Sequence, residues 1–172
     1  MSSERSIAAS GGRVGEAHGW IRPAEPVEAE LLSWIAYCAK ASWGYADGLM
    51  ARFGQANSFT PAQLAQRDFQ VYETGGGAVG FYELGGSPLH IEHLWVLPTE
   101  QGKGVGRALV EHACARAREL GAEALFVVSE SNAVGFYRRC GFVACGERES
   151  RLEPGLRLPR LRRELTGARN RS

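Results

Sequence analysis

Apolar residues recur at helical spacing in several segments of the chain. In residues 27–40 and 107–120 they fall three and four positions apart, which places them on one face of a helix. Gly121 follows the second segment as its expected C-terminal cap. Thr60 and Pro61 supply an N-cap and a first-turn proline for another helix. The shorter predicted helices are residues 47–53, 61–66 and 133–140.

Short apolar or alternating runs, separated by glycine and proline, predict β-strands. They occupy residues 18–24, 69–73, 78–84, 89–97, 124–128, 142–148 and 158–165. Three glycines at residues 75–77 predict a hairpin turn between the second and third strands. Residues 94–97 are all apolar, so helices are expected on both faces of the sheet. We therefore predict an α/β fold with one central mixed sheet of about six to seven strands and helices on both faces.

A glycine-rich turn, Gln-Gly-Lys-Gly-Val-Gly at residues 101–106, lies between a predicted strand and the helix at residues 107–120. The first turn of a helix has N–H groups without intrahelical partners, and the helix dipole favours an anion there. A strand, a glycine-rich turn and a helix in this order are typical of a phosphate-binding site.

The residue types in this turn agree with an anion site. Gly102, Gly104 and Gly106 lack side chains that would keep an anion away, and Lys103 and Arg107 add positive charge. A tight turn without a ligand is the alternative. The turn matches neither of two common nucleotide loops. In G-x-G-x-x-G spacing the third glycine would fall on Arg107, and the chain has no Gly-Lys-Ser or Gly-Lys-Thr.

Two motifs carry a resemblance to a known family. Gln101-x-x-Gly104-x-Gly106 resembles the Gln/Arg-x-x-Gly-x-Gly/Ala motif of the GNAT superfamily of N-acetyltransferases. Residues 92–98 resemble the family's central strand, and residues 132–142 resemble its second signature. The resemblance implies a GNAT-like fold. It also implies transfer of an acetyl group from acetyl-coenzyme A to a primary amine of a small molecule or peptide.

The resemblance also implies which residues bind acetyl-coenzyme A. These are Leu94, Trp95, Val96, Gln101, Gly102, Lys103, Gly104, Val105, Gly106, Arg107, Asn132, Phe136 and Tyr137. The glycine-rich turn would hold the pyrophosphate, main-chain amides of the strand would polarise the thioester carbonyl, and Asn132 would contact pantetheine. Asn132 equally fits a helix N-cap.

Tyr137 is the implied partner of the leaving thiolate. A phenol of pKa about 10 stays protonated at neutral pH, but full transfer of its proton to a thiolate is uphill by roughly 2 kcal/mol. The predicted role is therefore a hydrogen bond to the thiolate, and a core tyrosine is the alternative. On the same helix, Arg138 and Arg139 are expected to point outward, with contacts to coenzyme A phosphates as the alternative.

The acceptor amine must lose a proton before it attacks. For an alkyl amine this costs roughly 4 kcal/mol at neutral pH, so a carboxylate or imidazole is expected to assist. The candidates are His90, Glu92 and His93, and Glu92 matches a position where many family members carry a base. Strand alternation is expected to place His90 and Glu92 on the face of Leu94, and His93 on that of Trp95. Because this alternation would place His90 and His93 on opposite faces, no metal site is expected. The alternative role for Glu92 is an ion pair with a cationic side chain.

Trp43 and Tyr45 are predicted to contact the acceptor. They lie in residues 42–45, which interrupt the first helical pattern, and in the family this segment commonly lines the acceptor pocket. Aromatic rings can stack on or enclose an amine. The alternative is that both rings pack over the core.

Bulk properties narrow the partners. The net charge is +1 over 172 residues, which gives no field for nucleic acid or a membrane. No apolar run reaches the ~20 residues of a membrane span, and no export signal is evident, so a cytoplasmic location is expected. The basic cluster at residues 157–163 is predicted to be an edge strand. Four cysteines without C-x-x-C spacing are expected to be small buried hydrophobic residues.

One domain at residues 18–165 is predicted, with a mobile tail at residues 1–17 and a frayed basic tail at residues 166–172. The alternative function is a non-catalytic domain that binds acetyl-coenzyme A and regulates a partner. The acceptor stays open among small amines, amino acids, aminoglycosides, peptide N-termini and protein lysines. The resemblance also implies a homodimer, because many family members pair.

Overall fold

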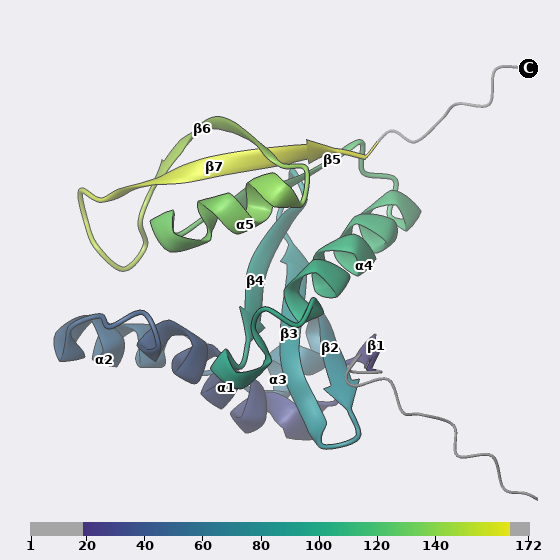
Figure 1. The fold of residues 1–172 in the computed structure, drawn as a ribbon, viewed down its shortest axis with the longest axis vertical. Coiled ribbons are helices and arrows are strands. Elements are labelled where there is room, and N and C mark those ends of the chain that lie inside the picture. The colour runs from purple at the N-terminus through teal and green to yellow at the C-terminus, as the bar shows by residue number, and fades with distance from the viewer. Residues whose placement is uncertain (1–18, 166–172) are drawn as a thin grey trace, which may run out of the picture.

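The computed structural model describes residues 19–165, which build a seven-stranded mixed β-sheet (Figure 1). The strand order across the sheet is β1-β2-β3-β4-β5-β7-β6. The strands are β1 (Trp20–Pro23), β2 (Asp68–Thr74), β3 (Gly77–Gly85), β4 (His90–Val96), β5 (Ala124–Val128), β6 (Val143–Glu149) and β7 (Arg157–Glu164). The predicted mixed sheet is confirmed. The tails predicted at residues 1–17 and 166–172 lie outside the described residues.

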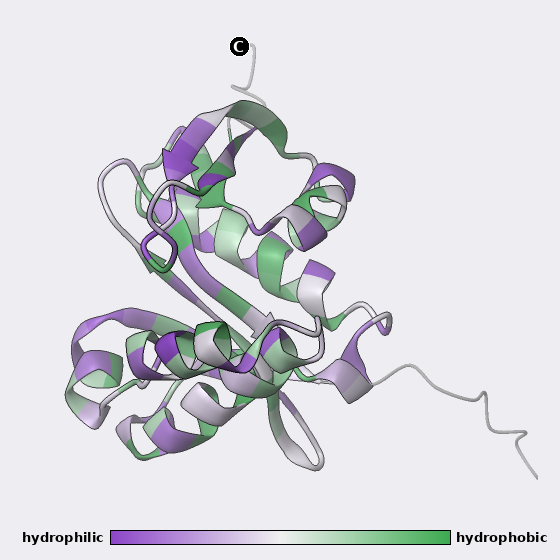
Figure 2. Cartoon of the chain, turned by 90° about the vertical axis from the view of Figure 1, so that its left-hand side faces the viewer, coloured by the Kyte–Doolittle hydropathy of each residue, from purple (hydrophilic) through white to green (hydrophobic). Residues whose placement is uncertain are grey.

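Helices cover both faces of the sheet, as predicted. In the described part of the chain they are α1 (Ala29–Ala41), α2 (Asp47–Ala56), α3 (Pro61–Gln66), α4 (Val105–Glu119) and α5 (Val134–Arg139). The first three pack on one face and α4 and α5 on the other. Hydrophobic and hydrophilic residues alternate around these helices (Figure 2), as expected for helices with one buried side. Within residues 19–165, no helix combines the length and apolar character that a membrane crossing requires.

Local sequence signals explain where these helices begin and end. Thr60 and Gln63 form a capping box at the start of α3. The Gln63 N–H donates to Thr60 Oγ1 at 3.2 Å, and the Thr60 N–H donates to Gln63 Oε1 at 2.9 Å. Just beyond α4, Gly121 has a φ of 79°, a left-handed conformation that glycine adopts readily. Both predicted signals are confirmed.

The sheet opens into a fork at its centre. β4 and β5 are parallel and are joined by two residue pairs, His90 with Phe126 and Ile91 with Val127. Beyond Ile91 the strands separate, and α4 carries the chain from the far end of β4 to the start of β5. The fork leaves one edge of β4 without a neighbouring strand.

A β-bulge at Glu92 changes which way the side chains of β4 face. Glu83 of β3 pairs with His93 of β4, but the next residue, Leu84, pairs with Ile91. Glu92 therefore has no partner on β3 and is the extra residue of the bulge. Leu94 packs toward α4, whereas Glu92 and His93 line a hollow on the opposite side of the sheet. His90 lies on that side too, because the extra residue reverses the alternation below it. The predictions that Glu92 shares the face of Leu94 and that His90 and His93 lie on opposite faces are therefore wrong.

β7 is an interior strand. It pairs with β5 on one side and with β6 on the other, so β6 forms the edge of the sheet. The prediction that residues 157–163 form an edge strand is wrong. An interior strand tolerates these arginines because acidic neighbours pair with them: Arg157 lies 2.9 Å from Glu147, and Arg163 lies 2.7 Å from Glu111.

The cysteines are free thiols in different surroundings. Cys114 and Cys140 are buried as predicted, but Cys145 is exposed on the edge strand β6.

Two large aromatic side chains of α1, Trp34 and Tyr37, are exposed. The homodimer stays a prediction.

Candidate active site

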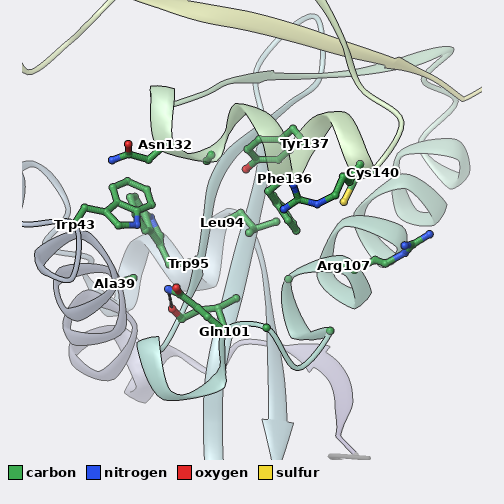
Figure 3. A pocket seen from close by; sticks show the side chains of 16 residues that line it. Ala39, Trp43, Leu94, Trp95, Gln101, Arg107, Asn132, Phe136, Tyr137 and Cys140 are labelled. Atoms are coloured by element: carbon green, nitrogen blue, oxygen red, sulfur yellow. Dashed lines mark hydrogen bonds between the residues drawn. The ribbon is translucent and has the colours of Figure 1, made fainter.

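A cavity of about 440 Å³ lies beside the part of β4 that has separated from β5 (Figure 3). Its walls come from β4, the turn before α4, α5 with its preceding turn, and the end of α1. The lining residues are Ala39, Trp43, Leu94, Trp95, Val96, Gln101, Gly102, Gly104, Gly106, Arg107, Asn132, Ala133, Phe136, Tyr137, Arg139 and Cys140. Only the fold brings these distant segments together.

The main chain of β4 presents N–H groups to the fork. The Leu97 N–H donates to Val79 O beside β3 at 2.9 Å, and this direction alternates along a strand. The N–H groups of Leu94 and Val96 therefore point to the opposite edge, where β5 has separated. The Gln101 side chain donates to Val96 O at 3.1 Å on that same edge. Leu94 thus offers a backbone donor within the fork.

The N-terminus of α4 forms one end of the cavity. Gly104 is the N-cap, with a φ of 87°, and Gly102 has a φ of 76°. Glycine takes these conformations without strain. The Ala108 N–H donates to Gly104 O at 3.0 Å, so the N–H groups of residues 105–107 precede the first intrahelical bond. These free donors and the dipole of α4 favour an anion.

Gly106 lets the Phe136 ring approach the start of α4 closely. A Cβ at this position would lie 3.2 Å from the Phe136 ring, so Phe136 on α5 rests directly on the start of α4. At Gly102 and Gly104 an added Cβ would meet nothing within 4 Å. Positive φ is the constraint at those two positions, and steric fit is the constraint at Gly106.

Tyr137 projects from α5 into the cavity (Figure 3). Its ring packs edge-on against Phe136 and Phe142, with centroid distances of 5.1 and 5.5 Å, and these contacts fix its direction. Burial, and to a lesser extent Cys140, raises the pKa of Tyr137, so the hydroxyl keeps its proton and can donate. Burial also raises the pKa of Cys140, which is therefore a neutral thiol.

Lys40 packs against the aromatic rings of Trp43 and Tyr45 beside the cavity. Lys40 is 1 % exposed and forms an ion pair with Glu130, which follows β5. Its ammonium lies 4.5 Å from the ring centroid of Tyr45 and 5.5 Å from that of Trp43. The Tyr45 hydroxyl donates to Glu130 at 3.1 Å. These contacts join α1 to the end of β5 across the fork.

Asn132 lies in the short 3-10 turn Ser131–Ala133, and Ala133 is the N-cap of α5. The N-cap alternative for Asn132 is therefore wrong. Its amide donates to the Tyr45 hydroxyl at 3.5 Å. The side chain lies near Trp43 at the cavity end away from Arg107 (Figure 3).

Two arginines line the cavity on the side of α4 and α5. They are Arg107 and Arg139. Arg139 is exposed, as expected, and it also borders the cavity. The ammonium of Lys103 instead lies 3.3 Å from both carboxylate oxygens of Glu100.

The structure brings most of the predicted site residues to this cavity. Those that line it are Trp43, Leu94, Trp95, Val96, Gln101, Gly102, Gly104, Gly106, Arg107, Asn132, Phe136 and Tyr137. Glu92, Lys103, Val105 and Tyr45 do not line it. Val105 is buried in the core, and Tyr45 contacts Trp43 edge-on.

Glu92 lines a neighbouring hollow of about 510 Å³ on the other side of β4. The residues around this hollow are Gln66, Arg67, Asp68, Glu83, Leu84, Gly85, Gly86, Glu92, His93 and Arg151. Trp95 Nε1–H donates to His93 Nδ1 at 3.4 Å, which connects the cavity wall to the hollow. Residues 19–165 contain no group of three or more His, Cys, Asp or Glu side chains placed to hold a metal ion.

Burial shifts the pKa of two groups in this hollow. It raises the pKa of Glu83 to about 7, a shift that Arg67 opposes and Glu92 increases. It lowers the pKa of His93 to about 4, so His93 is neutral at pH 7. The two side chains approach to 3.6 Å, too far for a hydrogen bond, and a neutral His93 makes no ion pair.

Sequence reasoning missed Lys40, Glu130 and Glu83, although two of them left a signal. Lys40 follows Ala36 by four residues and so lies on the apolar face of α1, where a lysine indicates a buried charge that needs a partner. Glu83 interrupts the apolar run of β3 in the same way. Glu130 follows β5 in a turn, and no local pattern marks it.

Comparison with protein-family models identifies the family of this chain. Residues 52–164 match the family model described as "Acetyltransferase (GNAT) domain". The chain therefore belongs to the GNAT acetyltransferase family, in agreement with its fold and with the glycine-rich start of α4.

Individual relatives match over shorter stretches. The chain is 45% identical over 73 residues to the peptidyl-lysine N-acetyltransferase YjaB of Escherichia coli, covering 41% of this chain and 46% of that protein. It is 40% identical over 87 residues to the streptothricin acetyltransferase of Streptomyces lavendulae, covering 46% of each. The matches thus span about half the length of these curated relatives. A solved GCN5-related N-acetyltransferase from Rhodopseudomonas palustris shares the fold, with a TM-score of 0.77 and 24% identity over 89% of this chain and 99% of that one.

Removing either partner of the ion pair between Lys40 and Glu130 should destabilise the protein unequally. Glu130→Gln leaves a buried ammonium without its counter-charge and should lower the unfolding free energy by about 3 kcal/mol. Lys40→Met leaves a carboxylate side chain that is 26% exposed and can be hydrated, so the loss should be about 1 kcal/mol. Urea unfolding measures both. The control Glu147→Gln removes an exposed pair and should change little; equal losses for the first two variants would contradict the buried charge.

Glu83→Gln tests the raised carboxyl pKa. With a pKa of about 7 rather than 4.5, the folded protein keeps a proton that the unfolded chain releases, so stability falls as pH rises between these values. Glutamine cannot ionise. The Tm of Glu83→Gln relative to that of the parent protein should therefore be higher at pH 8 than at pH 5. The corresponding change in unfolding free energy is at most about 3 kcal/mol. Thermal unfolding followed by circular dichroism measures this; the same Tm difference at both pH values would refute it.

Proposed function

We propose that the protein is an N-acetyltransferase that moves an acetyl group from acetyl-coenzyme A to a primary amine of a small molecule or peptide. One observation carries the proposal. A single cavity joins a helix N-terminus suited to an anion, a backbone donor at Leu94 and the protonated phenol of Tyr137. Family membership supports the same activity.

The start of α4 is the proposed diphosphate site. The free N–H groups of residues 105–107 would donate hydrogen bonds to the phosphate oxygens, and the glycine turn before them allows close approach. Arg107 and Arg139 supply positive charge at the same side of the cavity. Asn132, near Trp43, is proposed to hydrogen-bond the amide-bearing pantetheine arm.

Leu94 and Tyr137 are the proposed catalytic donors. Acetyl-coenzyme A supplies the acetyl group as a thioester. The Leu94 N–H polarises the carbonyl of that group, in a site where burial strengthens the hydrogen bond. Tyr137 donates a hydrogen bond to the sulfur as the thiolate leaves. Because its pKa is raised, complete proton transfer from Tyr137 is less favourable than from an ordinary phenol.

Glu92 is proposed to help remove the proton of the amine from the hollow side of β4. Supplying a free alkyl amine at neutral pH costs roughly 4 kcal/mol, and a carboxylate acting through water lowers this cost. Burial lowers the pKa of its neighbour His93 to about 4, so His93 is a weaker base than an ordinary histidine. The amine thus approaches β4 from the side opposite α4.

The acceptor is proposed only as a primary amine. By their names, two relatives act on peptidyl-lysine and on streptothricin, which differ greatly in size. Trp43, with Tyr45 behind it, is proposed to border the acceptor. The alternative is a regulatory domain that binds acetyl-coenzyme A without turnover. Mass spectrometry of a panel of amines incubated with acetyl-coenzyme A separates the two, since binding without any acetylated product would favour the regulatory domain.

Gly104→Val should prevent cofactor binding. A side chain here would project at the proposed diphosphate site, so affinity for acetyl-coenzyme A should fall about 100-fold, equivalent to about 2.7 kcal/mol. Calorimetry measures this affinity. Gly155→Val is a matched control, because Gly155 also has a positive φ of 84° and open space around it but does not line the cavity. Undiminished binding by the Gly104 variant would remove the diphosphate from this turn.

Tyr137→Phe should lower kcat about 10- to 100-fold and change KM for acetyl-coenzyme A less than about threefold. The reason is that the hydrogen bond to sulfur strengthens only as the thiolate forms. Steady-state kinetics with a fixed amine measures both constants. The exposed Tyr37→Phe is the control. An unchanged kcat would exclude Tyr137 from the mechanism.

A further inference from the structure

The hollow beside Glu92 contains carboxylates that are not satisfied by the protein. Asp68, Glu83 and Glu92 line it. Asp68 accepts a hydrogen bond from Gln70 at 2.8 Å and pairs with Arg116, so its charge is balanced. Glu83 and Glu92 lack comparable partners.

Glu83 is the buried member. It is 4% exposed, and within residues 19–165 its Oε2 has no hydrogen-bond partner. The neutral His93 lies 3.6 Å from that oxygen, and the half-exposed guanidinium of Arg67 lies 3.6 Å from the other. An unpaired buried carboxylate oxygen is costly, so a cationic N–H donor that enters the hollow relieves this cost.

Glu92 reaches the hollow because glycines surround it. A Cβ at Gly85 would lie 3.2 Å from Glu92 Cγ, and one at Gly86 would lie 3.1 Å from Glu92 Oε1. Arg151, from the connection of β6 to β7, is 75% exposed and lies 4.0 Å from the carboxylate. This distance exceeds a hydrogen bond, so Arg151 is a loose counter-ion that a closer donor can displace. The carboxylate of Glu92 is near enough to Glu83 to raise its pKa.

We propose that this hollow binds the ammonium group of an organic cation at the unpaired oxygen of Glu83. Glu92 adds negative charge nearby and still accepts, through water, the proton of the reacting amine. An ammonium brings N–H donors for the unpaired Oε2 of Glu83, whereas a metal ion would need a set of ligands that residues 19–165 do not provide. Resting on the proposed function, the cation is a second, charged amino group of the acceptor. The first amino group then reaches the thioester at Leu94.

The spacing along β4 of residues that line the hollow and the cavity gives a length for such an acceptor. His93 lines the hollow and Trp95 lines the cavity, two residues apart on one face of β4, which corresponds to roughly 7 Å. A linear diamine with five methylene groups has a comparable separation between its nitrogens. 1,5-Diaminopentane is therefore the probe, and n-pentylamine, which lacks the second ammonium, is its matched control.

Calorimetry without acetyl-coenzyme A tests the hollow directly. The parent protein should bind 1,5-diaminopentane at least tenfold more tightly than n-pentylamine. Glu83→Gln should remove this preference, and Glu92→Gln should reduce it, while Glu147→Gln, on the exposed edge strand, should retain it. Thermal unfolding of each variant checks that it is folded. Equal binding of the two amines by the parent protein, or a preference that survives in folded Glu83→Gln, would overturn the proposal.

Kinetics and cofactor binding separate this proposal from the proposed function. Glu83→Gln should raise KM for 1,5-diaminopentane at least tenfold, with kcat within twofold and with unchanged affinity for acetyl-coenzyme A. KM for n-pentylamine should not change. If neither amine is acetylated, the binding preference still decides whether the hollow takes a cation. A KM increase that is the same for both amines would overturn the second-cation role.

Discussion

In the described residues 19–165, the two halves of the sheet meet through two residue pairs, His90 with Phe126 and Ile91 with Val127. Continued pairing would use the Leu94 N–H in the ladder and would fill the space that the cavity now occupies. The separation of β4 from β5 is therefore the constraint on which the site depends. Contacts outside the sheet therefore have to hold the two halves together. The ion pair of the buried Lys40 with the partly exposed Glu130 is one of them, because it joins α1 to the end of β5.

The sequence alone predicts what short-range physics determines. The capping box at Thr60, the glycine turn before α4 and the apolar stripe of α4 involve residues a few positions apart, and the structure contains all of them. The side of the cavity formed by the turn before α4 and by α5 was predictable for the same reason. Most of its residues come from two contiguous motifs, so their relative positions follow from local conformation.

What could not be predicted depends on contacts between distant segments. The bulge at Glu92 arises from the register between β3 and β4, and one extra residue moves a proposed base to the other side of the sheet. Glu83 becomes a buried acid only when α3 and the connection from β6 to β7 surround it. Likewise, β7 is an interior strand because β6 pairs back onto it, which periodicity within residues 157–163 does not reveal.

The contact of Phe136 with Gly106 fixes the start of α5 against the start of α4. On the proposed function, one helix carries the diphosphate site and the other carries Tyr137 beside the sulfur. Because the two helices pack directly against each other, the protein should select acyl donors by the length of the arm between the phosphates and the thioester. A donor whose arm is shorter or longer than pantetheine would leave its thioester out of register with Leu94 even if its phosphates were held correctly.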